Sequence, residues 1–399
     1  MYRAQVKAVT LPVTQWLEEF CSPGRFAEAC KACPDYGRIW SCPPGVPAAR
    51  EAFAPYERVQ IVGVKVIYDE AARAAAVTPE RTEELRRAAY GEAKAVLRES
   101  LLELEKVLPG SWSVAAGRCE LCSRCSRADG EPCRRPERMR LSFSGFGFDL
   151  GRVAEELLGM PLLWAAEGLP EYHVAVAALL ERGAQPEDGL ELEQKYIVAD
   201  TQPWDQFQDE VMGVLRRMGC TVERQGDVRQ RDVYYDTADD ALLRGGCSLR
   251  MRTAGEAALL TWKGKPAERQ GGLFARREEE LPVFDGDLRG ERVRTFLRSC
   301  LAELPGTGPE MLKRCAEVEN HRRLVRVADG GGVYELAFDE VAYTGPAGGH
   351  PCRERQMELE HKAGGSEGLA RLAAALQSAL PGLVCAQGSK YQRARTLLG

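Results

Sequence analysis

The sequence predicts an α+β protein of two domains: a cysteine-rich α+β domain, then a domain built on an antiparallel sheet closed into a barrel. Two observations lead to this prediction. Eight of the 14 cysteines lie before residue 140. Beyond residue 186, short segments with alternating charged and apolar residues indicate β-strands. Because these strands do not alternate with helices, an antiparallel sheet of about eight strands is expected.

Composition excludes several classes of protein. The chain has 399 residues, of which 44% are apolar and 28% charged, and a formal net charge of −5. This length favours two or three domains with real cores, and the mixed charges exclude a disordered chain. The acidic excess argues against a nucleic-acid-coating protein. No long apolar stretch is present, so we expect no signal peptide, no membrane partner and a cytoplasmic location.

Residues 183–189 are rich in Gly, Pro and charge and lack periodicity, which is typical of a linker. We therefore expect a first domain at residues 1–182 and a second at 190–399. In the first domain, residues 59–67 are β-branched and predict a buried strand. Residues 80–107 predict a long amphipathic helix, and residues 151–158 the start of another.

The second domain is predicted to open with a strand at 190–199 and a helix that begins near Trp204. Further strands are expected around 230–236, 247–253, 258–264, 274–281, 320–327, 332–340 and 354–362, with a helix near 366–380. Residues 284–318 are expected to form a partly helical insertion.

Charged residues recur on one face of these strands, because alternate residues of a strand point to the same side. A solvent-exposed face produces the same pattern in a single strand. A barrel of this size, however, encloses one ligand, and unpaired buried ions cost several kcal/mol each. Lys and Arg side chains suit phosphate oxygens, and Glu-x-Glu pairs suit Mg²⁺ or Mn²⁺. The combination predicts a site for a metal–polyphosphate complex.

Several motifs in the second domain carry this pattern in a particular order. They are Glu191-x-Glu193-x-Lys195, Tyr234-Tyr-Asp236-Thr, Leu249-Arg-Met-Arg252, Leu260-Thr-Trp-Lys263-Gly, Glu358-Leu-Glu360 and Ser389-Lys390. Through this ordered set, residues 188–399 resemble a CYTH domain, the fold of the triphosphate tunnel metalloenzymes. The resemblance implies a closed eight-stranded antiparallel β tunnel with flanking helices. The family includes thiamine triphosphatases, inorganic tripolyphosphatases and class IV adenylyl cyclases.

The resemblance also implies roles for individual residues. Metal ligands for Mg²⁺ or Mn²⁺ would be Glu191, Glu193, Asp339, Glu358 and Glu360. Phosphate ligands would be Lys195, Arg250, Arg252, Lys263, Arg322 and Lys390. Glu191, Glu193 and Lys195 would be catalytic. A register shift of one residue would exchange Arg322 for Arg323 on the binding face.

The expected activity is metal-dependent hydrolysis of a small triphosphate: thiamine triphosphate, inorganic tripolyphosphate or a nucleoside triphosphate. No nucleic-acid partner is expected. Two alternatives stay open from the sequence. The same site could cyclise ATP, as a class IV-type adenylyl cyclase does, or it could bind a polyphosphate or nucleotide as a sensor without turnover.

The first domain contains two groups of cysteines with close spacing. Cys119-x₂-Cys122-x₂-Cys125-x₇-Cys133, with Pro136 soon after, is similar to the loops that bind [4Fe–4S] clusters. Four thiolates would also satisfy Zn²⁺, and reduced or redox-active thiols are the third possibility. The other group is Cys21, Cys30, Cys33 and Cys42, of which the last three are candidates for a second metal site or for joining the first. Both groups could also be partly structural.

The remaining cysteines are scattered singly and are predicted to be ordinary core residues. They are Cys220, Cys247, Cys300, Cys315, Cys352 and Cys385. The Gly145-x-Gly147 segment is too short for a dinucleotide-binding loop and predicts a turn.

Three segments of the first domain carry a second resemblance: 36–44 (YGRIWSCPP), 116–122 (AGRCELC) and 132–136 (PCRRP). Over about residues 5–175, the chain resembles DUF2284, a cysteine-rich family of predicted metal-binding proteins. The resemblance implies metal binding and no particular reaction.

Overall fold

The computed structural model describes residues 2–108, 110–165, 168–182, 190–265, 267–269, 273–284, 290–386 and 388–398. The chain divides into two compact units. The first contains Met1–Gly183 with Ala254–Ala258 and Pro282–Asp287, and the second contains the rest. The expected linker, 183–189, lies outside the described residues, so the domain limits stay a prediction. None of the described helices is both long and apolar enough to span a bilayer.

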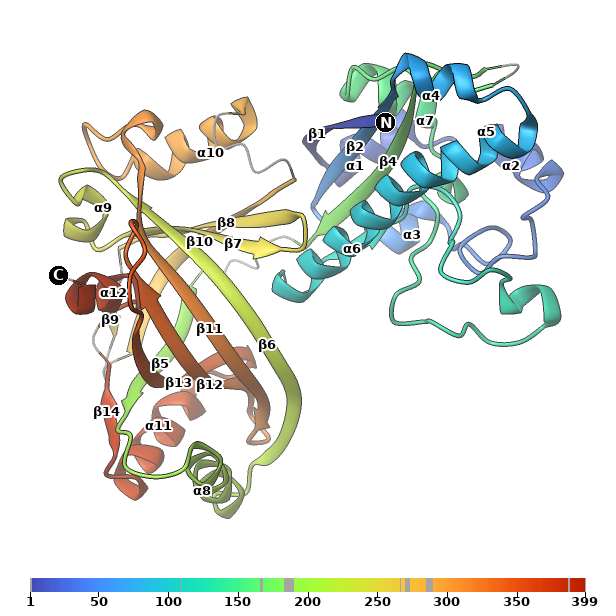
Figure 1. Cartoon of the computed structure of the whole chain (residues 1–399). Coiled ribbons are helices and arrows are strands. Elements are labelled where there is room, and N and C mark those ends of the chain that lie inside the picture. Colours follow the sequence, from blue (N-terminus) through green and yellow to red (C-terminus); the bar gives the residue numbers. More distant parts are fainter. Residues whose placement is uncertain are drawn as a thin grey trace. The chain divides into compact units, whose positions relative to one another are not determined.

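The first unit is built on a four-stranded antiparallel sheet with the order β1-β2-β4-β3 (Figure 1). Its strands are β1 (Tyr2–Pro12), β2 (Arg58–Tyr68), β3 (Trp112–Val114) and β4 (Tyr172–Glu181). Its helices are α1 (Val13–Phe20), α2 (Pro23–Ala32), α3 (Ala49–Phe53), α4 (Glu70–Ala75), α5 (Pro79–Arg86), α6 (Glu92–Val107) and α7 (Leu150–Arg152). Shorter helical turns are η1 (Arg87–Gly91), η2 (Ser126–Asp129), η3 (Ser144–Phe146) and η4 (Val153–Leu157).

Aromatic packing builds the core of the first unit. Helix α1 buries Val13, Trp16, Leu17 and Phe20, whose spacing of three and four residues places them on one helix face. The Trp16 ring stacks on the Phe148 ring with 4.0 Å between centroids. This core fixes one side of the sheet, and α6 packs against β2, β3 and β4.

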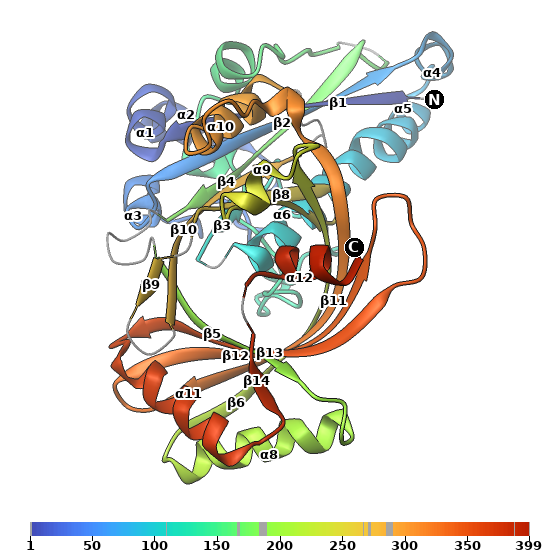
Figure 2. The same cartoon turned by 90° about the vertical axis from the view of Figure 1, so that its left-hand side faces the viewer.

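The second unit contains an antiparallel sheet with the order β14-β5-β13-β12-β11-β6-β7-β8-β10-β9 (Figure 2). The strands are β5 (Leu190–Val198), β6 (Thr221–Asp236), β7 (Ser248–Ala254), β8 (Ala257–Lys263), β9 (Ala267–Arg269), β10 (Leu273–Val283), β11 (Lys313–Ala328), β12 (Gly332–Thr344), β13 (Cys352–Gly364) and β14 (Leu383–Cys385). Over the described residues, strand β5 also pairs with β10 along four residues of each strand, and the fully closed barrel expected from the sequence is not found there.

Two helices, α8 (Trp204–Arg217) and α11 (Glu367–Ala379), cover the apolar side of this sheet. The other helices of this unit are α9 (Ala241–Arg244), α10 (Glu291–Leu301) and α12 (Lys390–Leu398), with the turn η5 (Pro309–Met311). Val211 of α8 and Leu372 of α11 share a fully buried cluster with Phe338 and Leu359 of the sheet. Because side chains alternate along a strand, the neighbours Asp339 and Glu358 point to the other face. Helices α8 and α11 thereby leave the other face of the sheet for charged residues and for α12, which carries Lys390.

Most expected elements are confirmed, and the structure corrects three details. The sheet has ten strands, counted over the described residues, because β9 and β14 add to the expected eight. The expected insertion at 284–318 is shorter, since β11 already begins at Lys313, and residues 285–289 lie outside the described part. The strand expected to end near Asp339 continues to Thr344. The expected turn at Gly145-x-Gly147 is confirmed, with Gly147 in the left-handed region.

Four of the six single cysteines are buried as predicted: Cys220, Cys247, Cys300 and Cys315. Cys352 is half-buried. The prediction is wrong for Cys385, which is exposed because β14 is a short strand at the end of the sheet order. No cysteine of the described chain forms a disulfide.

Candidate functional site

The strand register brings the predicted charged residues of β5 and β13 together. Glu193 lies opposite Glu360, and Lys195 lies opposite Glu358. Directly opposed residues of antiparallel strands share one face. The Lys195 Nζ lies 3.0 Å from the Glu193 carboxylate and 3.3 Å from that of Glu358.

Arg322 and Lys390 complete this network from β11 and α12. The Arg322 guanidinium donates two hydrogen bonds to Asp339, at 2.8 and 2.6 Å, and a further one to Glu358. Lys390 Nζ donates to Asp339 at 2.8 Å and to Glu358 at 2.5 Å. Two carboxylates therefore hold two cations in one small volume, with Lys195 at the edge.

Burial and ion pairing shift the pKa values of these carboxylates in opposite directions. Burial raises the pKa of Asp339, but the charges of Arg322 and Lys390 outweigh it, and the pKa falls below its usual value. Glu358 behaves in the same way under Lys195, Lys390 and Arg322, and its pKa lies well below the usual value. Both carboxylates are therefore ionised at neutral pH, as ligands for cations must be.

A second network lies on β6, β7, β8 and β10. Asp232 accepts two hydrogen bonds from Arg252, at 2.7 and 2.8 Å, and lies 3.5 Å from Arg250. Glu278 contacts Arg250 at 3.7 Å and Lys263 at 3.2 Å. Burial raises the pKa of Asp232, but Arg252 and Arg250 outweigh it and hold this pKa at about 2. The charge of Lys390 lowers it too, so the two networks are close together.

We call the two networks together the charged cluster. It consists of Glu193, Lys195, Asp232, Arg250, Arg252, Lys263, Glu278, Arg322, Asp339, Glu358 and Lys390. Glu360 is held beside it by the register and also contacts Lys362 at 2.7 Å. The backbone of Glu191 pairs with Arg276, but its side chain lies outside the described part.

The structure distinguishes Arg322 from Arg323. Arg322 belongs to the charged cluster, whereas Arg323 pairs with Asp205 of α8 and lies 3.8 Å from Glu340. The two side chains point to opposite faces of β11, as strand alternation requires. Of the two arginines, Arg322 is the one that lies with the other predicted phosphate ligands.

The two cysteine groups of the first unit lie side by side. Ser41 Oγ accepts a hydrogen bond from the Cys119 backbone N–H at 2.8 Å and lies 3.8 Å from the sulfur of Cys42. Arg127 donates to the carbonyl oxygens of Ile39 and Cys42, both at 2.9 Å. These contacts place the chain around Cys42 next to the chain around Cys119.

Within each group, neighbouring thiols raise the pKa of one cysteine. Burial raises the pKa of Cys42, a hydrogen bond with Ser41 lowers it, and Asp35, Cys33 and Cys30 raise it. Burial also raises the pKa of Cys119, a backbone hydrogen bond lowers it, and Cys133 and Cys125 raise it. Cys21 differs from these thiols, since its sulfur contacts the Phe146 carbonyl oxygen at 3.6 Å and packs against the core.

Two protein-family models match this chain. The model of the CYTH domain matches residues 190–394, slightly more than half of the chain. The chain belongs to the CYTH family. Residues 5–180 match the model of a predicted metal-binding protein, DUF2284. A search of curated proteins found no match.

Solved structures similar to this CYTH protein cover about half of its chain. A candidate adenylyl cyclase from Hippeastrum, described as having a dominant triphosphatase activity, is 16% identical over 52% of this chain and 95% of its own, with a TM-score of 0.38. A Pyrococcus horikoshii protein is 19% identical over 52% and 98%, with a TM-score of 0.30. The Mimivirus capping-enzyme triphosphatase is 9% identical over 48% and 90%, with a TM-score of 0.26.

The donor chemistry of this CYTH protein fits the metals that the two matching family models imply. Carboxylates of the charged cluster are hard oxygen donors, the type that Mg²⁺ and Mn²⁺ prefer. Thiolates of the cysteine groups are soft donors that suit zinc or iron–sulfur clusters. Within the described residues, no three Cys, His, Asp or Glu side chains are grouped closely enough to hold an ion. The residues therefore fit these metals in the type of donor atom and in the strand register that brings the carboxylates to one face.

Sequence reasoning missed Asp232, which joins Arg250 and Arg252. The sequence contained an indication of it, because Asp232 and Asp236 are four residues apart and therefore lie on the same face of β6. Asp236 has another function: its carboxylate accepts hydrogen bonds from the backbone of Leu242, at 2.8 Å, and from the hydroxyl of Tyr391, at 2.6 Å. This aspartate of the Tyr-Tyr-Asp-Thr motif thereby holds the start of α9 against α12.

Glu280 of β10 is another carboxyl beside the charged cluster, and it is half-buried. Thr261 donates a hydrogen bond to it at 3.3 Å. Burial and then the neighbouring Glu278 raise its pKa to about 7, while Arg250, Lys263 and Arg252 act in the opposite direction. With this pKa, Glu280 loses its proton near neutral pH.

Proposed function

We propose that the CYTH part of this chain hydrolyses a small triphosphate with the help of a divalent metal ion. One observation carries the proposal: all six predicted phosphate ligands contact carboxylates of the charged cluster. Catalysis of phosphoryl transfer is mainly positioning and charge stabilisation, for which such cations are suited. The substrate would be thiamine triphosphate, inorganic tripolyphosphate or a nucleoside triphosphate.

The carboxylates hold the cations ready for the substrate. Arg322 and Lys390 share Asp339 and Glu358, so their donors are fixed before a phosphate group arrives. Arg250 and Arg252 are fixed in the same way by Asp232. Preorganised donors lose little freedom on binding and stabilise the charge that develops on the transferred group.

The metal would be held by carboxylates of β5, β12 and β13. The candidate ligands are Glu191, Glu193, Asp339, Glu358 and Glu360. When bound, a divalent cation neutralises phosphate charge and lowers the pKa of a coordinated water. Lys195, which contacts Glu193 and Glu358, would hold the phosphate oxygens next to these carboxylates.

The test is phosphate release from tripolyphosphate, thiamine triphosphate and ATP, each with Mg²⁺ or Mn²⁺. We expect Arg322→Ala to lower kcat/KM by about a hundredfold or more. Arg323→Ala is the matched control, because this neighbour lies on the other face, and it should retain activity. Equal rates for the two variants would contradict the site, and a cyclic nucleotide from ATP without phosphate release would contradict hydrolysis.

We also propose that the first unit binds a metal through its cysteine groups, as an iron–sulfur cluster or as Zn²⁺. The ligand candidates are Cys30, Cys33, Cys42, Cys119, Cys122, Cys125 and Cys133. Elemental analysis and visible absorption of anaerobically purified protein distinguish iron from zinc. Cys122→Ser should lose metal, whereas Cys385→Ser, which changes an exposed thiol elsewhere, should keep it.

A further inference from the structure

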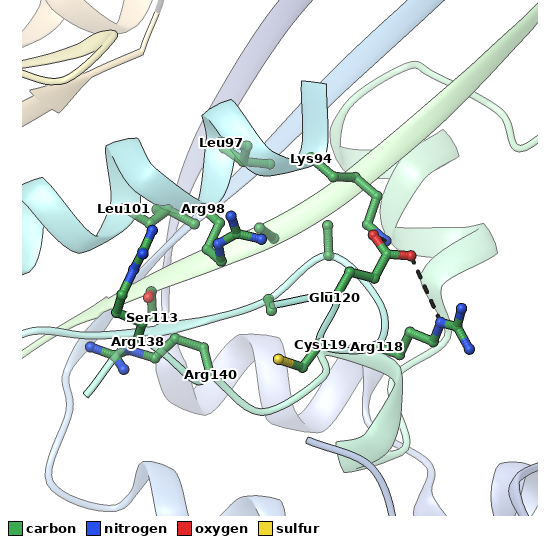
Figure 3. Close-up of a pocket in the computed structure, with 13 residues that line it drawn as sticks. Lys94, Leu97, Arg98, Leu101, Ser113, Arg118, Cys119, Glu120, Arg138 and Arg140 are labelled. Atoms are coloured by element: carbon green, nitrogen blue, oxygen red, sulfur yellow. Dashed lines mark hydrogen bonds and ion pairs between the residues drawn. The ribbon is translucent and has the colours of Figure 1, made fainter. Parts of the chain in front are cut away.

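The first unit contains a small pocket beside Cys119 whose lining is strongly basic (Figure 3). Residues of α6, of the chain from Ser113 to Glu120, and of the segment around Arg138 line it, with Ala177 of β4. Its charged lining residues are Lys94, Arg98, Arg118, Glu120, Arg138 and Arg140. Five cations and one carboxylate therefore surround the same space.

The carboxylates that orient three of the arginines are not part of the lining. Arg98 and Arg138 both donate to the same oxygen of Glu99, at 3.0 and 2.5 Å. Arg140 is held by Glu105, to which it donates a hydrogen bond at 2.8 Å and a second one. Two guanidinium charges thus share the carboxylate of Glu99, and the pocket keeps an excess of positive charge.

Lys94, Glu120 and Arg118 line the other side of the pocket (Figure 3). Lys94 contacts Glu120 at 3.0 Å, and Arg118 contacts Asp35 at 2.9 Å. The exposed fraction of the Lys94 side chain is only 11%, and that of Arg140 is 14%. Because solvent and salt screen such cations weakly, they attract an anion more strongly than surface charges do.

We propose that this pocket binds a single phosphate-type oxyanion, held by Arg98, Arg138 and Arg140. A carboxylate has two oxygens and satisfies one guanidinium fork, whereas a phosphate group offers oxygens to several guanidinium groups. The cavity volume is about 30 Å³, which leaves room for one small anion. The bound anion lies next to Cys119. The proposal is independent of triphosphate hydrolysis.

Hydrogen–deuterium exchange of the full-length protein tests this site, because its peptides separate the pocket from the charged cluster. The probe is inorganic phosphate at millimolar concentration, without triphosphate or added divalent metal. We expect several-fold slower exchange in peptides that cover 113–120 and 138–143. The double variant Arg98→Gln/Arg138→Gln should lose this protection while the peptides of β11 to β13 respond as in the wild type.

Arg81→Gln is the matched control, because Arg81 also pairs with one carboxylate, Glu84 at 2.7 Å, but does not line the pocket. It should keep the protection. If the double variant fails to fold by circular dichroism, Arg138→Gln alone replaces it, since this side chain is 39% exposed. No protection in the wild type, or protection that persists in the folded variant, would overturn the site. Equal protection by acetate would overturn its assignment to phosphate.

Discussion

At the scale of single residues, the CYTH part contains buried ion pairs whose members depend on one another. The charged cluster places cations and carboxylates where solvent is largely excluded: Asp339 is 0% exposed and Lys390 is 8% exposed. Groups of this kind are costly to bury and are tolerated only when each has partners. Removing one partner therefore has a larger effect than removing a surface pair.

Asp232 gives the first prediction. Asp232→Asn leaves Arg250 and Arg252 without their shared counter-charge, which should lower the free energy of unfolding by about 3–5 kcal/mol. The folded pKa of about 2 lies below the ordinary value of 3.8. The stability that this group contributes is therefore present above pH 3.8 and lost as the pH falls towards 2. Urea unfolding at several pH values measures both effects; an unchanged midpoint at pH 7 would contradict the role.

Glu280 should show the opposite pH dependence. Its pKa is raised from 4.5 to about 7, so its contribution to stability is complete below pH 4.5 and is lost as the pH rises through 7. Glu280→Gln cannot ionise, so relative to wild type it should gain about 2–3 kcal/mol between pH 5 and 8. Glu279→Gln, the adjacent residue that pairs with Arg277, is the control. If thermal unfolding midpoints of both variants follow the wild type across this range, Glu280 is not the titrating group.

At the scale of elements, the alternation of charge predicted which residues share a face. Glu193, Lys195 and Glu358 were placed together correctly, because a period of two residues fixes the face of a strand. Strand length could not be predicted in the same way. Strand β6 begins at Thr221, nine residues before the predicted start, because its exposed first half lacks an apolar face. The strands β1, β3, β4, β9 and β14 were not predicted either.

The partners of the cations depend on tertiary contacts and are invisible in the sequence. Lys390 stands on α12, and only folding places it against Asp339 of β12. Asp232 contacts Arg252 because β6 and β7 pair in a register that puts these two residues opposite each other. The sequence indicated charged faces, whereas the division into particular ion pairs required the structure.

Helix α11 provides a prediction at this scale. Leu372 is fully buried between the helix and the sheet, so Leu372→Ala should leave a cavity and cost about 2–5 kcal/mol of stability. Gln377→Ala changes an exposed residue of the same helix and should shift stability by less than about 0.5 kcal/mol. Denaturant unfolding compares them. Similar losses for both would show that α11 does not cover the sheet through this face.

At the scale of the whole molecule, two units with separate cores carry two different kinds of donor. The first unit has an aromatic core around Trp16 and the cysteine groups, and the second has a core around Phe338 and the charged cluster. Thiol groups select soft metals and carboxylates select hard ones. Each proposed metal site is thus chemically distinct and built from residues of one unit.

This separation predicts that the two metals can be removed one at a time. Cys122→Ser should lose the metal of the first unit and keep phosphate release from the preferred triphosphate within about twofold, because its change leaves the charged cluster and its core intact. Glu193→Gln should have the reverse effect: it removes a carboxylate that contacts Lys195, so it should lose activity while keeping the cysteine-bound metal. Elemental analysis and phosphate release on the same preparations measure both quantities. If Cys122→Ser abolishes hydrolysis in a protein that keeps its wild-type unfolding midpoint, the metal of the first unit controls the CYTH site, and independence is refuted.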